Sequence, residues 1–131
     1  AYRKPLPAID IVASGLRDTI GLYQHASEAE RACCKAWLAA FDASHLADRN
    51  YMTLSSGEQR LIMLVRAFVK NPDLLILDEP FHGLDNCHRK RAQAIIDCFM
   101  RNTRKTLIMV THYEEELPSC IDHRLVLKKH R

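Results

Sequence analysis

Two short apolar runs on either side of a helical stretch constrain the fold of this chain most. Leu74–Leu77 is apolar at every position, and Thr106–Thr111 forms a second run after the helical stretch Asn86–Arg101. Unbroken apolar runs are typical of strands buried between helices in parallel sheets. The order strand, helix, strand therefore predicts an α/β fold with a parallel sheet. A short acidic helix is expected at Tyr113–Leu117, and a third strand at Arg124–Lys128.

The first 50 or so residues show helical patterns and little sign of strands. One apolar face recurs at three- and four-residue spacing and comprises Ile9, Val12, Leu16 and Ile20. Ser27 and Glu30 have the spacing of a capping box and predict the start of a second helix. We therefore expect a helical subdomain at residues 1–53 and an α/β core at residues 54–131.

The segment Leu54–Gln59 precedes a third amphipathic helix that Asn71-Pro72 ends. Ser55 and Glu58 again have capping-box spacing. The start of a helix attracts anions, because its first backbone N–H groups lack partners and its dipole is positive there. Two interpretations remain at this stage: a phosphate-binding helix start, or an ordinary capped helix.

Polar residues follow both predicted strands. Asp78 and Glu79 come directly after the first strand, and His112 follows the second. Ligands of open α/β sheets bind beyond the carboxyl ends of the strands. A carboxylate pair at that edge suits magnesium-phosphate chemistry, in which one group holds the metal and the other orients or deprotonates water. The alternative is that these residues are simply hydrophilic strand ends.

Taken together and in order, these segments resemble a known family. Leu54–Gln59, Leu74–Pro80, Gly83-Leu84-Asp85 and His112 closely resemble the C-terminal half of an ABC-type ATPase domain. The resemblance covers residues 50–131, and the preceding helices are similar to the helical subdomain of that family. It implies part of a P-loop nucleotide-hydrolase parallel sheet with an N-terminal helical subdomain.

The resemblance also implies roles for individual residues, with ATP and magnesium as the cofactors of the intact protein. The signature motif would include Ser55, Ser56, Gly57 and Glu58. Ser55 and Gly57 would contact the γ-phosphate of ATP held by a partner domain. Asp78 would lie near magnesium, Glu79 would be the catalytic base, Asp85 would belong to the D-loop, and His112 would contact the γ-phosphate.

The sequence departs from the family pattern in two respects. Ser56 stands where the family usually has glycine, and the four glycines of the chain form no G-x-x-x-x-G-K-[ST] phosphate loop. The adenine-stacking aromatic residue and the Q-loop are also missing. In the family these elements precede the helical subdomain. We therefore expect an ATPase only as the intact protein, and no tight ATP binding or hydrolysis by this chain alone.

The resemblance favours a transporter ATPase, with a weaker similarity to molybdenum-transport ATP-binding proteins. The implied partners are a second ABC ATPase domain, in tandem or as a dimer, and a membrane permease. The implied location is the cytoplasm, at the inner membrane through the permease. A formal net charge of +3 is too small to predict direct nucleic-acid binding. Two alternatives remain open: a soluble ABC ATPase acting in translation or nucleic-acid repair, and a non-catalytic interaction domain.

Overall fold

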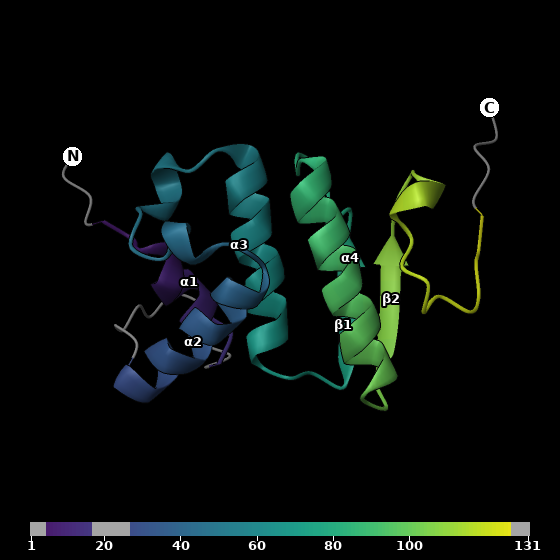
Figure 1. Ribbon diagram of the computed structural model, residues 1–131, viewed down its shortest axis with the longest axis horizontal. Coiled ribbons are helices and arrows are strands. Elements are labelled where there is room, and N and C mark those ends of the chain that lie inside the picture. Colours follow the sequence, from purple (N-terminus) through teal and green to yellow (C-terminus); the bar gives the residue numbers. More distant parts are fainter. Residues whose placement is uncertain (1–4, 17–26, 127–131) are drawn as a thin grey trace.

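The computed structural model describes residues 5–16 and 27–126, in which helices and two strands follow one another. The elements are α1 (Ala8–Ser14), α2 (Glu28–Ala40), α3 (Ser56–Val69), β1 (Leu74–Asp78), α4 (Asn86–Arg101) and β2 (Thr106–Val110). Three short 3-10 helices are η1 (Ser44–Leu46), η2 (Tyr51–Thr53) and η3 (Glu114–Glu116). In the view of Figure 1 the helices α1–α3 lie to the left of α4, β1 runs behind α4, and β2 lies to its right. No helix in these described ranges is long and apolar enough to cross a membrane.

Both predicted capping boxes are present and fix the starts of α2 and α3. The Ser27 hydroxyl accepts from the Glu30 backbone N–H at 3.2 Å, and the Glu30 carboxylate accepts from the Ser27 N–H at 2.9 Å. Ser55 and Glu58 exchange the same two bonds at 3.1 and 2.9 Å. Each box satisfies two backbone N–H donors that would otherwise lack partners. The third helix therefore begins where its sequence predicts.

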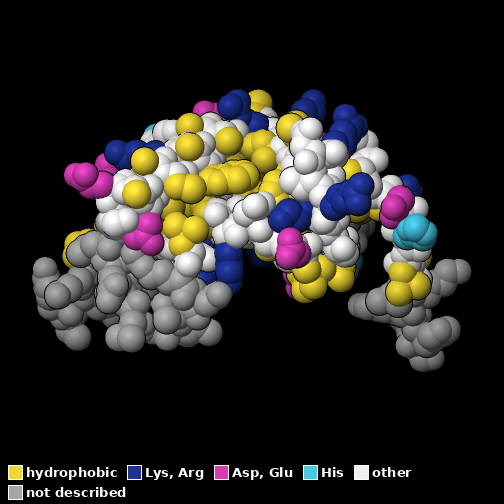
Figure 2. All heavy atoms as spheres, turned by 90° about the horizontal axis from the view of Figure 1, so that it is seen from below, with side chains coloured by type: hydrophobic (Ala, Val, Ile, Leu, Met, Phe, Trp, Pro, Cys, Tyr) yellow, Lys and Arg dark blue, Asp and Glu magenta, His cyan; other side chains and the backbone are white. Residues whose placement is uncertain are grey.

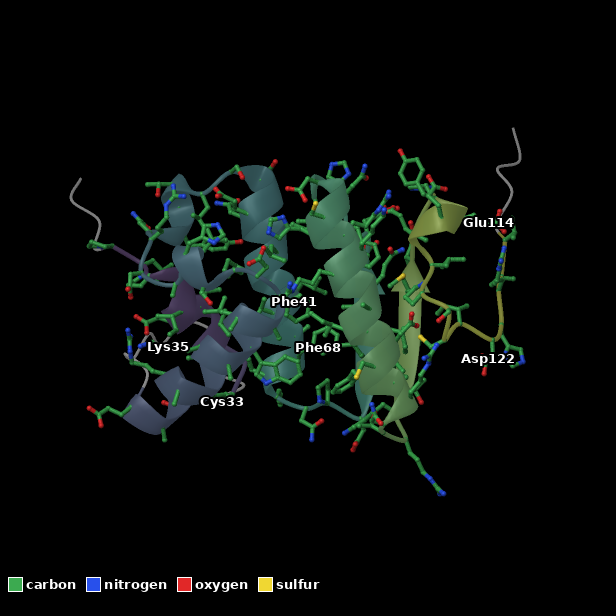
Figure 3. All side chains as sticks on the ribbon, viewed as in Figure 1. Cys33, Lys35, Phe41, Phe68, Glu114 and Asp122 are labelled. Carbon is green, nitrogen blue, oxygen red and sulfur yellow. The ribbon has the colours of Figure 1, made fainter. Side chains whose placement is uncertain are left out.

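The helices α1, α2 and α3 pack into one apolar cluster. Phe41 and Phe68 are almost fully buried and lie side by side between α2 and α3, with ring centroids 5.4 Å apart (Figure 3). Trp37 lies against Phe68, with centroids 5.6 Å apart, and Phe68 meets Phe99 of α4 edge to face at 5.1 Å. Such aromatic pairs contribute about 0.5–1.5 kcal/mol beyond area burial. The aromatic cluster thus joins the helical part of the chain to the C-terminal end of α4.

The sheet is parallel, as the sequence predicts, and consists of β1 and β2 within the described residues. The register runs from Leu74 opposite Thr106 to Asp78 opposite Val110. Leu75 and Leu77 are buried on the face that α4 covers. The other face is exposed, with relative exposures of 49% for Leu74, 61% for Ile76, 48% for Ile108 and 49% for Val110. The prediction of strands buried on both faces is therefore met on one face only, since no described element covers the second.

Exposed apolar side chains also occur beyond the sheet. Seen from below, hydrophobic side chains form a broad band across the middle of the molecule (Figure 2). Among the large exposed hydrophobic residues, Met52 is 60% and Met63 44% exposed. Met63 and Ile76 line a shared depression between α3 and β1. The apolar surface therefore continues from the sheet onto α3.

The predicted third strand is absent where the structure describes the chain. Residues 124–126 form no ladder, and Leu125 and Val126 are 85% and 74% exposed. Arg124 instead pairs with Glu114 of η3. Apolar residues favour a strand locally, but a strand forms only where a neighbouring edge pairs with it. Residues 127 and 128 of the predicted strand, like Ile20 of the first predicted helical face, lie outside the described residues.

Candidate functional site

The parallel register brings the predicted strand-end residues to one edge of the sheet. Asp78 ends β1 opposite Val110, the last residue of β2. The Glu79 backbone N–H donates to the Val110 carbonyl at 2.8 Å, which extends the pairing by one residue. Glu79 has a positive φ of 48°, a strained conformation for a residue other than glycine. This turn takes the chain out of the sheet and leaves the Glu79 side chain at the strand ends.

Glu79 and His112, 33 residues apart in sequence, meet at this edge. His112 Nε2 lies 3.2 Å from Glu79 Oε1. The His112 side chain is 83% exposed, whereas that of Glu79 is 23% exposed. Glu79 Oε1 is itself enclosed and accepts no well-oriented hydrogen bond from the described residues, so His112 is the side chain that faces this oxygen. A carboxylate in this position can accept a proton from a ligand at the strand ends, and the neighbouring imidazole can donate a hydrogen bond to that ligand.

Asp78 lies at the same strand end and is exposed. Its backbone carbonyl accepts from Arg60 Nη1 of α3 at 3.5 Å, which ties the end of β1 to α3. An exposed carboxylate beside a depression can supply one oxygen ligand to a magnesium ion that keeps water and phosphate oxygens as its other ligands. The donor chemistry of Asp78 therefore fits the metal that the resemblance implies.

The start of α3 presents Ser55 and Ser56 as exposed residues. The hydrogen bond donated by the Ser55 backbone N–H lowers the pKa of Glu58 below its ordinary value. Arg49 lies 3.5 Å from the Glu58 carboxylate and also favours its charged form. The side chains of Ser55 and Glu58 are thus committed to the capping box, so an anion here would meet chiefly backbone N–H groups and the helix dipole.

Gly57 in the first turn of α3 lies directly against Gly83 in the loop before α4. A Cβ added to Gly57 would lie 2.4 Å from the Gly83 carbonyl oxygen. Gly83 has φ +81°, a region that side-chain-bearing residues rarely adopt. The start of α3 and the loop before α4 therefore touch backbone to backbone, and glycine is required at both positions.

Asp85 is the N-cap of α4 and accepts from the His88 backbone N–H at 2.8 Å. The His88 ring also lies on this carboxylate, with Nδ1 3.0 and 3.1 Å from its two oxygens. The backbone bond and then the ring lower the pKa of Asp85. Sequence reasoning did not predict that His88 contacts Asp85. The available signal was the Asp85-x-x-His88 spacing, which places a side chain three residues into a helix over its cap.

The starts of α3 and α4 and the end of β2 lie at the same end of the molecule (Figure 1). Between the two helix starts is a shallow hollow of about 210 Å³, lined among others by Ser55, Gly57, Glu58, Asp85 and His88. The structure thus brings the predicted residues of α3 and α4 together around one hollow. It places Asp78, Glu79 and His112 together at the strand ends.

Comparisons with known proteins show the family to which this chain belongs. The family model described as "ABC transporter" matches residues 7–82. The ABC transporter ATP-binding protein ModF of Escherichia coli is 38% identical over 125 residues, which are 95% of this chain and 26% of that protein. The aliphatic sulfonates import ATP-binding protein SsuB 1 of Nocardia farcinica is 35% identical over 99% of this chain and 52% of its own length. The chain thus spans between a quarter and a half of these relatives.

A solved structure shows the same fold. It is described as a dimeric, post-hydrolysis state of the ATP-binding cassette MJ0796 bound to ADP and Pi. The TM-score is 0.74 at 22% identity, over 85% of this chain and 48% of the other. At this identity the likeness concerns the fold alone. It matches the predicted partial α/β architecture of helices and parallel strands.

Proposed function

Because this chain belongs to the ABC transporter family, we propose that it forms the signature and strand-end half of a domain that hydrolyses ATP to drive transport. The observation that carries the proposal is the contact between His112 Nε2 and Glu79 Oε1 at 3.2 Å. Each residue follows a different predicted strand. They meet beyond the carboxyl ends of the strands, where ligands of open α/β sheets bind.

The proposed chemistry at the strand ends is attack of water on the γ-phosphorus of ATP. Glu79 accepts a proton as the new bond between oxygen and phosphorus forms, and the bond to the ADP oxygen breaks. His112 faces solvent next to Glu79 and donates a hydrogen bond to the γ-phosphate, whose charge grows in the transition state. Phosphoryl transfer needs mainly positioning and charge stabilisation of this kind. Asp78 would hold magnesium, which neutralises phosphate charge when bound.

The phosphate loop required for this reaction is not among the motifs of the sequence, so the rest of the nucleotide site comes from other segments. We propose that the exposed apolar face of β1 and β2 packs against those segments of the same domain. Burying Leu74, Ile76, Ile108 and Val110 there would stabilise the complete domain, at about 25 cal/mol for each Å² of apolar surface removed from water. The division into residues 1–53 and 54–131 belongs to this proposal.

The start of α3 is proposed to serve ATP held by a second ABC ATPase domain, in tandem or in a dimer. Support comes from the exposure of Ser55 and Ser56 and from the backbone contact of Gly57 with Gly83, which places the loop before Asp85 beside them. Exposed residues at a helix start can meet a phosphate on another domain. The energised partner would be a membrane permease, with the ATPase bound at its cytoplasmic side.

Molybdate is the cargo proposed for the first transport test, on the overall resemblance to molybdenum-transport ATP-binding proteins. No group of three or more metal-binding side chains occurs in the described part of the chain. The choice of cargo is assigned in this proposal to the permease. Uptake of molybdate and of an aliphatic sulfonate, compared in cells with and without the gene, distinguishes the two cargoes.

Replacing Glu79 by Gln in the full-length protein tests the proposal. The amide keeps the shape of the side chain but cannot accept the proton, so we expect ATP binding to persist and turnover to fall by about 10²–10⁴-fold. Glu115→Gln is the matched control, since this exposed carboxylate follows β2 in the η3 turn. Turnover of the Glu79 variant within a few-fold of the control would contradict the assignment of Glu79 as the base.

A further inference from the structure

We infer that His88 is a positioning residue that holds Asp85 and the start of α4 against the end of α2 at Asp42. The contact itself is independent of function. Its consequence for ATP turnover rests on the proposed function, in which Asp85 lies beside the nucleotide.

The geometry places the His88 ring between two segments 43 residues apart. On one side, Nδ1 lies 3.0 Å from Asp85 Oδ1. On the other side, Nε2 lies 3.4 Å from the Asp42 carbonyl oxygen and 4.0 Å from Asp42 Oδ2. Asp42 has φ 57°, a left-handed conformation that aspartate tolerates better than most residues and that ends the α2 segment. His88 therefore bridges the end of α2 and the cap of α4.

A second contact makes this junction more than a single bond. Arg91, one turn along α4 from His88, donates from Nε to the Ala40 carbonyl at the end of α2 at 2.7 Å. This bond satisfies one of the terminal carbonyls that a helix leaves without an internal partner. The first two turns of α4 are thus fixed to the end of α2 at two points.

The bridge depends on the proton count of the ring, because both of its partners are acceptors. A neutral imidazole has one N–H donor, so it satisfies either Asp85 or Asp42 and turns a lone pair toward the other. The imidazolium ion donates on both sides. The charged groups around the ring are Asp85 of α4, Asp42 after α2, and, lining the same hollow, Glu58 of α3 and His45 of η1; Arg49 is paired with Glu58. The nearest charges are therefore carboxylates, which favour the protonated ring.

Burial lowers the pKa of His88, but the hydrogen bonds to Asp85 and Asp42 outweigh it and raise that pKa above its ordinary value. A raised pKa in the folded state means that the bridge is fully formed below about pH 6.5, the ordinary value, and is lost as the pH rises through the higher folded value.

The contact is tested first without reference to activity, by NMR titration of the histidine rings in the full-length protein. Loss of one signal in His88→Gln identifies the His88 resonance. We expect it to titrate above about 6.5, and to titrate lower in Asp85→Asn and in Asp42→Asn. Asparagine suits both positions, because it can cap a helix and tolerates a left-handed backbone. A His88 signal that titrates at the ordinary value, or that neither variant moves, would overturn the inference.

The second measurement is steady-state ATP turnover of the full-length protein. We expect His88→Ala to lower kcat about tenfold at pH 6.5 with little change in KM, since the side chain touches no part of ATP in the proposed site. His88→Arg, whose guanidinium keeps its donors at every pH, should recover much of kcat and flatten its dependence between pH 6 and 8. Cys87→Ala, at an exposed neighbouring position, is the control.

The two measurements separate the possible failures. If the NMR titration shows the bridge and His88→Ala keeps the kcat and pH profile of the wild type, the positioning role is wrong. If the wild-type protein neither binds nor hydrolyses ATP, the proposed function is wrong, and the titration still decides whether the bridge exists.

Discussion

Replacing Gly57 by Ala gives the sharpest test of the junction between the start of α3 and the loop before α4. The new methyl group would lie 2.4 Å from the Gly83 carbonyl oxygen and 3.1 Å from the Gly83 carbonyl carbon. Contacts under 3.0 Å are essentially never seen for real Cβ atoms, and the obstructing atoms belong to the backbone rather than to a flexible side chain. One of the two segments must therefore move.

The expected loss of stability follows from two opposing effects. In an unobstructed helix, Gly→Ala stabilises by about 0.5–1 kcal/mol, because alanine has less backbone freedom to lose. Overpacking a tight contact costs about 1–3 kcal/mol. A clash with a backbone oxygen belongs in the upper half of that range, so after the helix-propensity gain the free energy of unfolding should fall by about 1–2.5 kcal/mol. With a urea slope of about 1–3 kcal/mol per M, the midpoint should fall by roughly 0.3–2.5 M.

The assay is urea unfolding of the 131-residue chain, followed by the fluorescence of its single tryptophan, Trp37. Trp37 contacts Phe68 of α3 and therefore reports the loss of helix packing. Ser56→Ala is the control, because it changes the adjacent residue of the same turn without adding an atom. A Gly57→Ala midpoint equal to or above that of the wild type would show that helix propensity dominates, and it would refute the close approach of the two backbones.

Three further predictions concern other parts of the molecule. Ser55→Asp in the full-length protein should keep the cap of α3 and its stability but abolish ATP-dependent association of the domains, because a carboxylate then faces phosphate. The Ser55→Asn variant should associate normally. An equal loss of association in both variants would contradict the proposed phosphate contact. His112→Ala should lower turnover about 100-fold, as expected for removal of one transition-state donor, whereas His123→Ala should not, in a steady-state ATPase assay. Burial raises the pKa of Asp97, but the hydrogen bonds from Cys120 and Ser119 outweigh it and lower that pKa. Asp97→Asn should therefore lower the free energy of unfolding by about 1 kcal/mol at pH 7. In urea titrations this difference should vanish as the pH falls through the lowered pKa, below about pH 4.

Short-range patterns predicted much of the fold, because the interactions behind them span only a few residues. Capping boxes at Ser27 and Ser55 each require two side chains three residues apart, and both are present. The helix at Asn86–Arg101 has the predicted bounds, since Asp85 caps its start and the polar residues after Arg101 end its apolar spacing. The parallel pairing followed from the order of the elements alone.

The interactions that sequence reasoning did not predict join distant segments. The apolar residues after Arg124 predicted a strand, but no strand pairs with them in the described part of the chain. Arg124 pairs with Glu114 instead. The bridge from His88 to Asp42 spans 46 residues and depends on a left-handed residue at the end of α2. Neither the pairing edge nor the backbone conformation is encoded in a local pattern. The predicted site residues nevertheless lie together, at the strand ends and at the helix starts.

The exposed face of β1 and β2 also affects how this chain behaves while it is being made. Its apolar residues Leu74, Ile76, Ile108 and Val110 stand on neighbouring strands, and each strand has one pairing neighbour among the described residues. The unpaired backbone N–H and C=O groups along an open strand edge can template pairing with another copy, and the exposed apolar face favours such an encounter. When another segment of the same molecule covers the face, the rate constant does not depend on protein concentration. The rate of encounters between two copies increases with the square of the protein concentration. The yield of native protein should therefore depend on synthesis rate and on chaperones that shield this face until it is covered.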